Sequence, residues 1–147
     1  MTVMLKAAAF DPYGELLKYQ SRHRPGAWGA TASFVGTMRD FNGGHSVRSM
    51  VLEHYPGMTE RSLEELAVHA ASRWALVDSL IIHRTGRVAP GDPIVLVAVW
   101  AAHRADAFEA CRHMVEALKS RAPFWKKEAT DEGERWVEGN TPGTSNE

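Results

Sequence analysis

The sequence has a single cysteine, almost no net charge and no long hydrophobic run, and each of these absences limits the class of protein. Cys111 has no second cysteine to pair with, so an internal disulfide is excluded and a reducing compartment is favoured. No apolar run approaches the roughly 20 residues of a membrane span, and residues 1–10 lack the basic start and apolar core of a signal peptide. We therefore expect a soluble cytoplasmic protein.

Motifs for nucleotides and metal ions are also missing. There is neither a Walker phosphate loop nor a Gly-x-Gly-x-x-Gly motif that opens a helix. Seven histidines are present, but none has a convincing ligand spacing to a cysteine or a carboxylate, so we expect no metal and no cofactor. Cys111 shares an apolar helical stripe with Phe108 and Val115, which favours a small core residue over a nucleophile.

Length and hydrophobic pattern predict one domain over residues 1–138, followed by a disordered tail over residues 139–147. The expected strands and helices are separated by Gly, Pro and Asn turn signals. The strands are expected at residues 4–10, 28–35, 47–55, 77–84 and 94–102, and the helices near residues 16–19 and at 63–74 and 104–119.

Two hairpins are expected among these strands. Asn42-Gly43-Gly44 predicts a turn that pairs strand 28–35 with strand 47–55, and the Pro90-Gly91-Asp92 turn predicts that strand 77–84 pairs with strand 94–102. The last strand is almost wholly apolar, which indicates a central position in the sheet. We therefore expect an α+β fold with a mainly antiparallel sheet and two long packed helices.

A dense basic cluster lies at residues 119–128. Its members are four cations and two aromatic residues: Lys119, Arg121, Phe124, Trp125, Lys126 and Lys127. Since the formal net charge of the chain is −1, this cluster is a local feature that suits an anion. Neighbouring ammonium groups lower one another's pKa, which suits an amine for chemistry near neutral pH. Lys119 also has a purely structural explanation, because a lysine in the last turn of a helix stabilises the helix dipole.

Two further places could bind an anion. His103 and Arg104 stand at the expected start of the second long helix, where a cation is unfavourable unless an anion joins it, although a solvated first turn explains them equally well. Arg39 follows strand 28–35, and an exposed ion pair with Asp40 is the simpler explanation for it taken alone.

Several ordered strings resemble the large subunit of molybdopterin synthase over roughly residues 4–138. They are Phe34-Val-Gly-Thr-Met-Arg-Asp40, Leu52-Glu-His-Tyr-Pro-Gly-Met-Thr-Glu60, His83-Arg-Thr-Gly86, Gly91-Asp92, Ala102-His-Arg104 and Leu118-Lys-Ser-Arg-Ala-Pro-Phe-Trp-Lys-Lys-Glu128. The resemblance implies the hammerhead-like fold of that family and a sulfurtransferase of molybdenum cofactor synthesis. In that family a small ubiquitin-like subunit carries sulfur as a thiocarboxylate on its C-terminal Gly-Gly. The substrate is cyclic pyranopterin monophosphate, which becomes molybdopterin.

The resemblance also implies roles for individual residues and a homodimer that gives a heterotetramer with two small subunits. Lys119 and Lys126 match catalytic lysines, and Arg39, His103 and Arg104 match positions that hold the pterin phosphate. The expected pocket walls are Thr37, Met38, Lys127 and Glu128. Met38 stands where a smaller apolar residue is usual. The tail stands in place of the longer helical C-terminus of some relatives, so nothing is carried over beyond about residue 140.

A function of another class also fits the cationic cluster. The same fold could serve a non-catalytic module that binds a phosphorylated metabolite or a partner's acidic tail. The lysines would then act only as counter-charges, and removing Lys119 would weaken binding instead of turnover.

Overall fold

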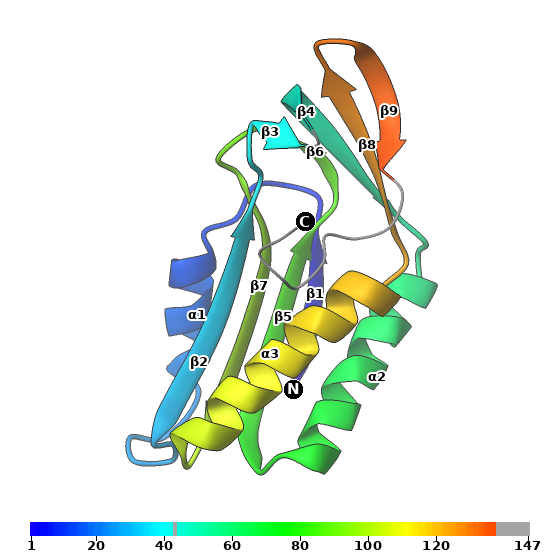
Figure 1. The fold of residues 1–147 in the computed structure, drawn as a ribbon. Coiled ribbons are helices and arrows are strands. Elements are labelled where there is room, and N and C mark those ends of the chain that lie inside the picture. Colours follow the sequence, from blue (N-terminus) through cyan, green and yellow to red (C-terminus); the bar gives the residue numbers. More distant parts are fainter. Residues whose placement is uncertain (43, 138–147) are drawn as a thin grey trace.

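The computed structural model describes residues 1–42 and 44–137, which form three helices and nine strands (Figure 1). In chain order the elements are β1 (Thr2–Lys6), α1 (Pro12–Gln20), β2 (Ala30–Thr37), β3 (Phe41–Asn42), β4 (His45–His54), α2 (Met58–Arg73), β5 (Leu76–Arg84), β6 (Gly86–Val88), β7 (Pro93–Ala101), α3 (Arg104–Arg121), β8 (Phe124–Thr130) and β9 (Gly133–Val137). The expected α+β class with mainly antiparallel sheets is confirmed. The predicted tail at 139–147 lies outside the described residues.

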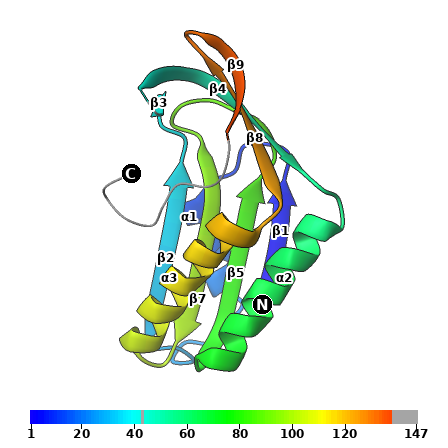
Figure 2. The ribbon, with the colours of Figure 1, turned by 45° about the vertical axis from the view of Figure 1, so that its right-hand side comes forward.

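The first sheet has the strand order β1-β5-β7-β2, in which only the β1–β5 pair is parallel. Helices α2 and α3 cover one face and α1 covers the other (Figures 1 and 2). Strand β7 is buried along almost its whole length, because helices cover both of its faces and β5 and β2 flank it. The predicted central position of this strand and its hairpin with β5 are therefore confirmed.

The second sheet corrects the other predicted hairpin. Strand β2 pairs with β7 and not with β4. The predicted Asn-Gly-Gly turn includes Gly43, which lies outside the described residues, and on either side of it Asn42 pairs with His45 in the short β3–β4 ladder. Strand β4 instead pairs with β8 and β6, and β9 completes this sheet beyond β8. The physical reason is that alternation specifies the two faces of a strand but not its partner, whereas the apolar β7 needs a neighbour on each edge.

The residues of α3 that face the core also differ from the expected stripe. Cys111 and Leu118 are buried as predicted, but Phe108 is 68% exposed. The buried face includes Ala107 and Ala110, whose small side chains allow the helix to approach the first sheet closely. Phe108 is not part of this buried face and therefore lies on the surface.

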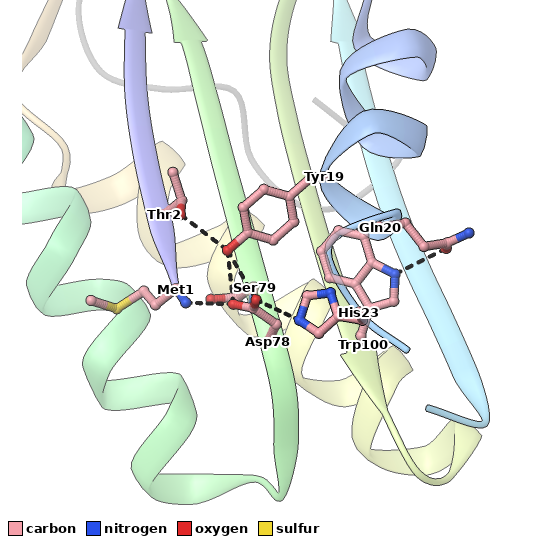
Figure 3. Close-up of polar contacts among 8 residues, drawn as sticks. All are labelled: Met1, Thr2, Tyr19, Gln20, His23, Asp78, Ser79 and Trp100. Atoms are coloured by element: carbon pink, nitrogen blue, oxygen red, sulfur yellow. Dashed lines mark hydrogen bonds and ion pairs between the residues drawn. The ribbon is translucent and has the colours of Figure 1, made fainter. Parts of the chain in front are cut away.

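A polar network at Asp78, near the start of β5, ties β1 and α1 to the sheet (Figure 3). The Asp78 carboxylate accepts hydrogen bonds from Tyr19 Oη at 3.0 Å and from the backbone N–H of Ser79 at 2.8 Å, and it pairs with the N-terminal amine. His23 Nε2 lies 2.9 Å from the same carboxylate. Burial alone would raise the pKa of Asp78, but these partners outweigh it and hold the pKa below its usual value.

No helix within residues 1–42 and 44–137 is long and apolar enough to cross a membrane.

Candidate active site

The end of β2, the last turn of α3 and the first half of β8 meet at a cavity of about 120 Å³. Six of the residues predicted for the site line it together: Thr37, Met38, Arg39, Lys119, Lys126 and Glu128. Thr37, Met38 and Arg39 are far in sequence from the two lysines and Glu128, which lie close to one another because α3 leads directly into β8 (Figure 2). The structure therefore assembles most of the predicted site in one place, which we call the lysine pocket.

The two lysines of this pocket are half-buried. Burial, and to a smaller extent the ammonium of Lys126, lower the pKa of Lys119 to about 8, while Glu116 opposes the change. Burial also lowers the pKa of Lys126, and the nearby Glu128 carboxylate opposes that change. The predicted effect of a neighbouring ammonium group is thus found at Lys119, where Lys126 lowers the pKa, whereas the lowered pKa of Lys126 is due to burial.

Lys127 differs from its neighbour because adjacent residues of a strand point to opposite faces. Its Nζ lies 2.9 Å from Glu134 Oε2 and 5.6 Å from the ring centroid of Trp136, outside the lysine pocket. The hydrogen bond to Glu134 raises the pKa of Lys127, so the expectation that all the clustered lysines have depressed pKa values was wrong for this residue.

Glu128 is buried in the lysine pocket with an ionic partner that the sequence analysis missed. Its Oε2 accepts a hydrogen bond from Arg135 Nη2 at 3.1 Å, and these two residues face each other across the β8–β9 ladder. Arg135 would have been found if residues 124–137 had been recognised as a hairpin. The remaining wall is mostly apolar and was also missed; it comprises Phe41, Val47, Met50, Ile94 and Val137.

Backbone contacts fix the segment that carries Arg39. Met38 N donates to Asp92 O at 3.0 Å, and Gly91 N donates to Met38 O at 2.8 Å. Gly91 has a φ of 90°, which favours glycine, so the Gly-Asp string has a structural role next to the pocket. Arg39 lines the pocket, and no ion pair with Asp40 is found in the part of the chain that the structure describes.

His103 and Arg104 are not in the lysine pocket of the same chain. They are exposed at the start of α3, and Lys119 is in its last turn. Arg104 and Lys119 are fifteen positions apart on the helix, which corresponds to about 22 Å along its axis. One chain alone therefore cannot bring these five cationic or catalytic candidates, Arg39, His103, Arg104, Lys119 and Lys126, to one small ligand.

A second hollow lies between α3 and the edge strand β2. It has a volume of about 430 Å³ and is mostly lined by small and apolar side chains. The lining comprises Thr31, Ala32, Ser33, Phe34, Phe108, Cys111, Arg112, Val115 and Glu116. We call it the β2–α3 groove, and the exposed Phe108 lies on it.

Comparisons with known proteins agree on one family. The family model described as MoaE protein matches residues 8–121. The molybdopterin synthase catalytic subunit of Pseudomonas aeruginosa is 51% identical over 139 residues, which is 95% of this chain and 91% of that protein. The solved structure of the molybdopterin biosynthesis MoaE protein from Burkholderia ambifaria is 46% identical, with a TM-score of 0.80 over 99% of this chain and 92% of that one. A chain in the complex of subunits 1 and 2 of molybdopterin-converting factor from Helicobacter pylori shares the fold, with a TM-score of 0.78 and 21% identity over 92% of this chain and 90% of that one.

Proposed function

This chain belongs to the MoaE protein family, and from that premise we propose that it acts as the catalytic subunit of a molybdopterin synthase. The observation that carries the proposal is the lysine pocket, where Lys119 and Lys126 share one cavity with Arg39. A pocket that only bound an anion would need positive charge but no lysine with a pKa near neutrality. The pKa of about 8 at Lys119 favours catalysis over the alternative of a non-catalytic binding module.

The sulfur comes from a second protein in this proposal. Cys111 is buried, and burial raises the pKa of its thiol to about 11, so it is a poor thiolate near neutral pH. A small ubiquitin-like subunit would instead present sulfur as a thiocarboxylate on its C-terminal Gly-Gly. The acceptor would be cyclic pyranopterin monophosphate. In each transfer sulfur would bond to a side-chain carbon of the pterin in place of an oxygen, and water would cleave the acyl carbon–sulfur bond and leave the small subunit with a C-terminal carboxylate. Two such transfers would form the dithiolene of molybdopterin.

Within the pocket we assign charge stabilisation to the lysines. The ammonium of Lys119 would stabilise the negative charge that develops as the thiocarboxylate reacts. Its lowered pKa would also ease transfer of a proton to the oxygen that sulfur displaces from the pterin side chain. Lys126 would supply a second positive charge, and the nearby Glu128 carboxylate favours its charged form. Thr37 and Met38 would form the adjoining wall, and Arg39 would bind phosphate through its planar guanidinium group.

His103 and Arg104 would come from a second copy of the chain. In a two-fold symmetric contact through the middle of α3, the start of one helix faces the end of the other. The β2–α3 groove, its exposed Phe108 and the open edge of β2 suit such a contact. The partner's helix start would then add its cations to the lysine pocket and complete the phosphate site.

Product formation tests the proposed function. The purified protein, mixed with a thiocarboxylated small subunit and cyclic pyranopterin monophosphate, should form molybdopterin. Lys119→Ala should reduce the rate by about 10²- to 10³-fold, the usual cost of removing one group that stabilises a developing charge. Lys127→Ala is the matched control and should retain nearly full activity, because Lys127 lies outside the pocket.

The outcome that contradicts the proposal is also defined. If Lys119→Ala forms product at the wild-type rate but binds the pterin phosphate more weakly, the pocket is a binding site and the alternative function is correct.

A further inference from the structure

Three strings of the sequence have no part in the proposed chemistry, yet they meet in the structure. They are Leu52–Glu60, His83–Gly86 and residues 121–124. The third string contains Ala122, Pro123 and Phe124, which connect the end of α3 to the start of β8. We call residues 122–124 the junction. It matters because Lys119 lies just before it and Lys126 just after it, so its conformation determines how far apart the two amines are.

Thr59 holds the junction from α2. Its side chain is completely buried, and its Oγ1 donates a hydrogen bond to Pro123 O at 3.1 Å. The same Oγ1 accepts a hydrogen bond from the backbone N–H of Tyr55 at 3.0 Å. One hydroxyl therefore joins the turn before α2 to the junction through two partly buried hydrogen bonds.

His83 holds the junction from β5. Its ring stacks on Phe124 with a centroid distance of 3.8 Å and an interplanar angle of 15°, and the residue is 3% exposed. Its Nδ1 lies 2.7 Å from the carbonyl oxygen of Arg84, and because a carbonyl only accepts, Nδ1 must carry the hydrogen. The ring therefore packs on the junction while its own orientation is fixed by the backbone of β5.

The charge state of His83 suits this position. Burial, with smaller contributions from Lys119, Lys126 and His54, lowers its pKa to about 3, although the hydrogen bond to the Arg84 carbonyl opposes the change. The imidazole is therefore neutral at physiological pH and adds no third positive charge beside the two lysines.

We propose that Thr59 and His83 are positioning residues that hold the junction and thereby set the spacing of Lys119 and Lys126. The inference rests on the roles proposed above for the two lysines. Neither residue lines the lysine pocket, so each acts through residues 122–124. If the junction loosens, the end of α3 and the start of β8 can separate, and Lys119 gains water and loses its close cationic neighbour.

Substitution of Thr59 tests this inference. Thr59→Val keeps the shape but removes the hydroxyl, and Thr59→Ser is the matched control because it keeps both hydrogen bonds. The readout is the rate at which a small amine-reactive reagent acylates Lys119 at different pH values, and its midpoint is the pH of half-maximal rate. Mass spectrometry identifies the acylated lysine, and the measurement requires no enzymatic activity. In Thr59→Val the midpoint should rise by about one pH unit from about 8 toward the ordinary lysine value, whereas Thr59→Ser should match the wild type.

The charged and titratable groups around Lys119 come from several elements and are the same in all these variants. They are Glu116 on α3, Lys126 and Glu128 on β8, Arg39 after β2 and His83 on β5. A shift in Thr59→Val therefore reports a change in spacing or hydration and not the loss of a charge. The kcat for molybdopterin formation should fall about tenfold in Thr59→Val, with the KM for the small subunit unchanged.

The contrary result is a lower melting temperature in Thr59→Val with the acylation midpoint of Lys119 unmoved, which would make Thr59 a structural residue only. If Thr59→Val does not fold, His83→Ala and His83→Phe decide the question. The alanine variant loses the stack on Phe124 and should show the raised midpoint, and the phenylalanine variant keeps a stacked ring and should not. A wild type that shows the midpoint near 8 but forms no molybdopterin would contradict the proposed function and leave this inference intact.

Discussion

At Lys119, burial and the charge of Lys126 act in the same direction on one proton. If the ammonium is the active form, kcat/KM should fall as the pH rises through about 8, because the protein then loses the charge that stabilises the reacting group. Lys126→Ala removes the neighbouring charge, so the descending limb of the pH profile should move to higher pH while the maximal rate falls. The measurement is the rate of molybdopterin formation between pH 6 and pH 10.

Two results at Lys119 would contradict this account. A rate that increases through pH 8 would show that the neutral amine is active, as a base or nucleophile. An unchanged descending limb in Lys126→Ala would show that the limb belongs to another group. Lys127→Ala should leave the profile as it is in the wild type.

The difference between Lys126 and Lys127 also shows which individual site residues can be predicted from the sequence. The clustering of charge predicted Lys119 and Lys126, the resemblance to the family added Arg39 and Glu128, and all four line the lysine pocket. Lys127 was included because the segment was not recognised as a strand, in which neighbours alternate between faces. Pro123 and the density of charge obscured the strand pattern of residues 124–130, and the pairing with β4 that creates it is not local.

The positions of strands and helices in the sequence were easier to predict than which strands pair and which helix faces pack. The periodicity that predicted β5, β7, α2 and α3 depends on nearby residues, and these elements are present. The pairing of β2 with β7 instead of β4 depends on the competition among all the strands, which no single stretch of sequence contains. The outward position of Phe108 has a similar origin, because the rotation of α3 is set by how closely its alanines approach the sheet.

The Asp78 network gives a stability prediction that involves β1, α1 and β5. Because its folded-state pKa is lowered, Asp78 stabilises the fold above its unfolded pKa of about 4, and that contribution is lost as the pH falls through the folded value. Asp78→Asn should lower the free energy of unfolding at pH 7 by about 1–3 kcal/mol, the cost of impairing hydrogen bonds to a partly buried charged group. Urea unfolding at several pH values measures this.

The critical feature is how the difference in the free energy of unfolding between Asp78→Asn and wild type depends on pH. The stabilities of Asp78→Asn and wild type should converge below about pH 4, and a constant difference down to pH 2 would show that the carboxylate charge is not the cause. Glu64→Gln on the exposed side of α2 is the control and should change stability by less than about 0.5 kcal/mol.

For the whole molecule, the proposed dimer explains why Phe108 is exposed and why one chain leaves Arg104 about 22 Å from Lys119. Phe108→Glu should give a folded monomer in sedimentation experiments, because the side chain is on the surface but would place a charge in the β2–α3 groove. The monomer should also lose activity although its own lysine pocket is intact. Val68→Glu, at a position 56% exposed on α2, should leave both the mass and the activity unchanged.

The most direct test of an active site built from the lysine pocket of one copy and the helix start of another is complementation between two inactive variants. Arg104→Ala and Lys119→Ala are each prepared as inactive proteins and then mixed under conditions that allow subunits to exchange. Random exchange should restore about a quarter of wild-type molybdopterin formation, because half of the dimers are mixed and one of the two sites in each mixed dimer is intact. No recovery, with mixed dimers demonstrated by mass spectrometry, would contradict the shared site.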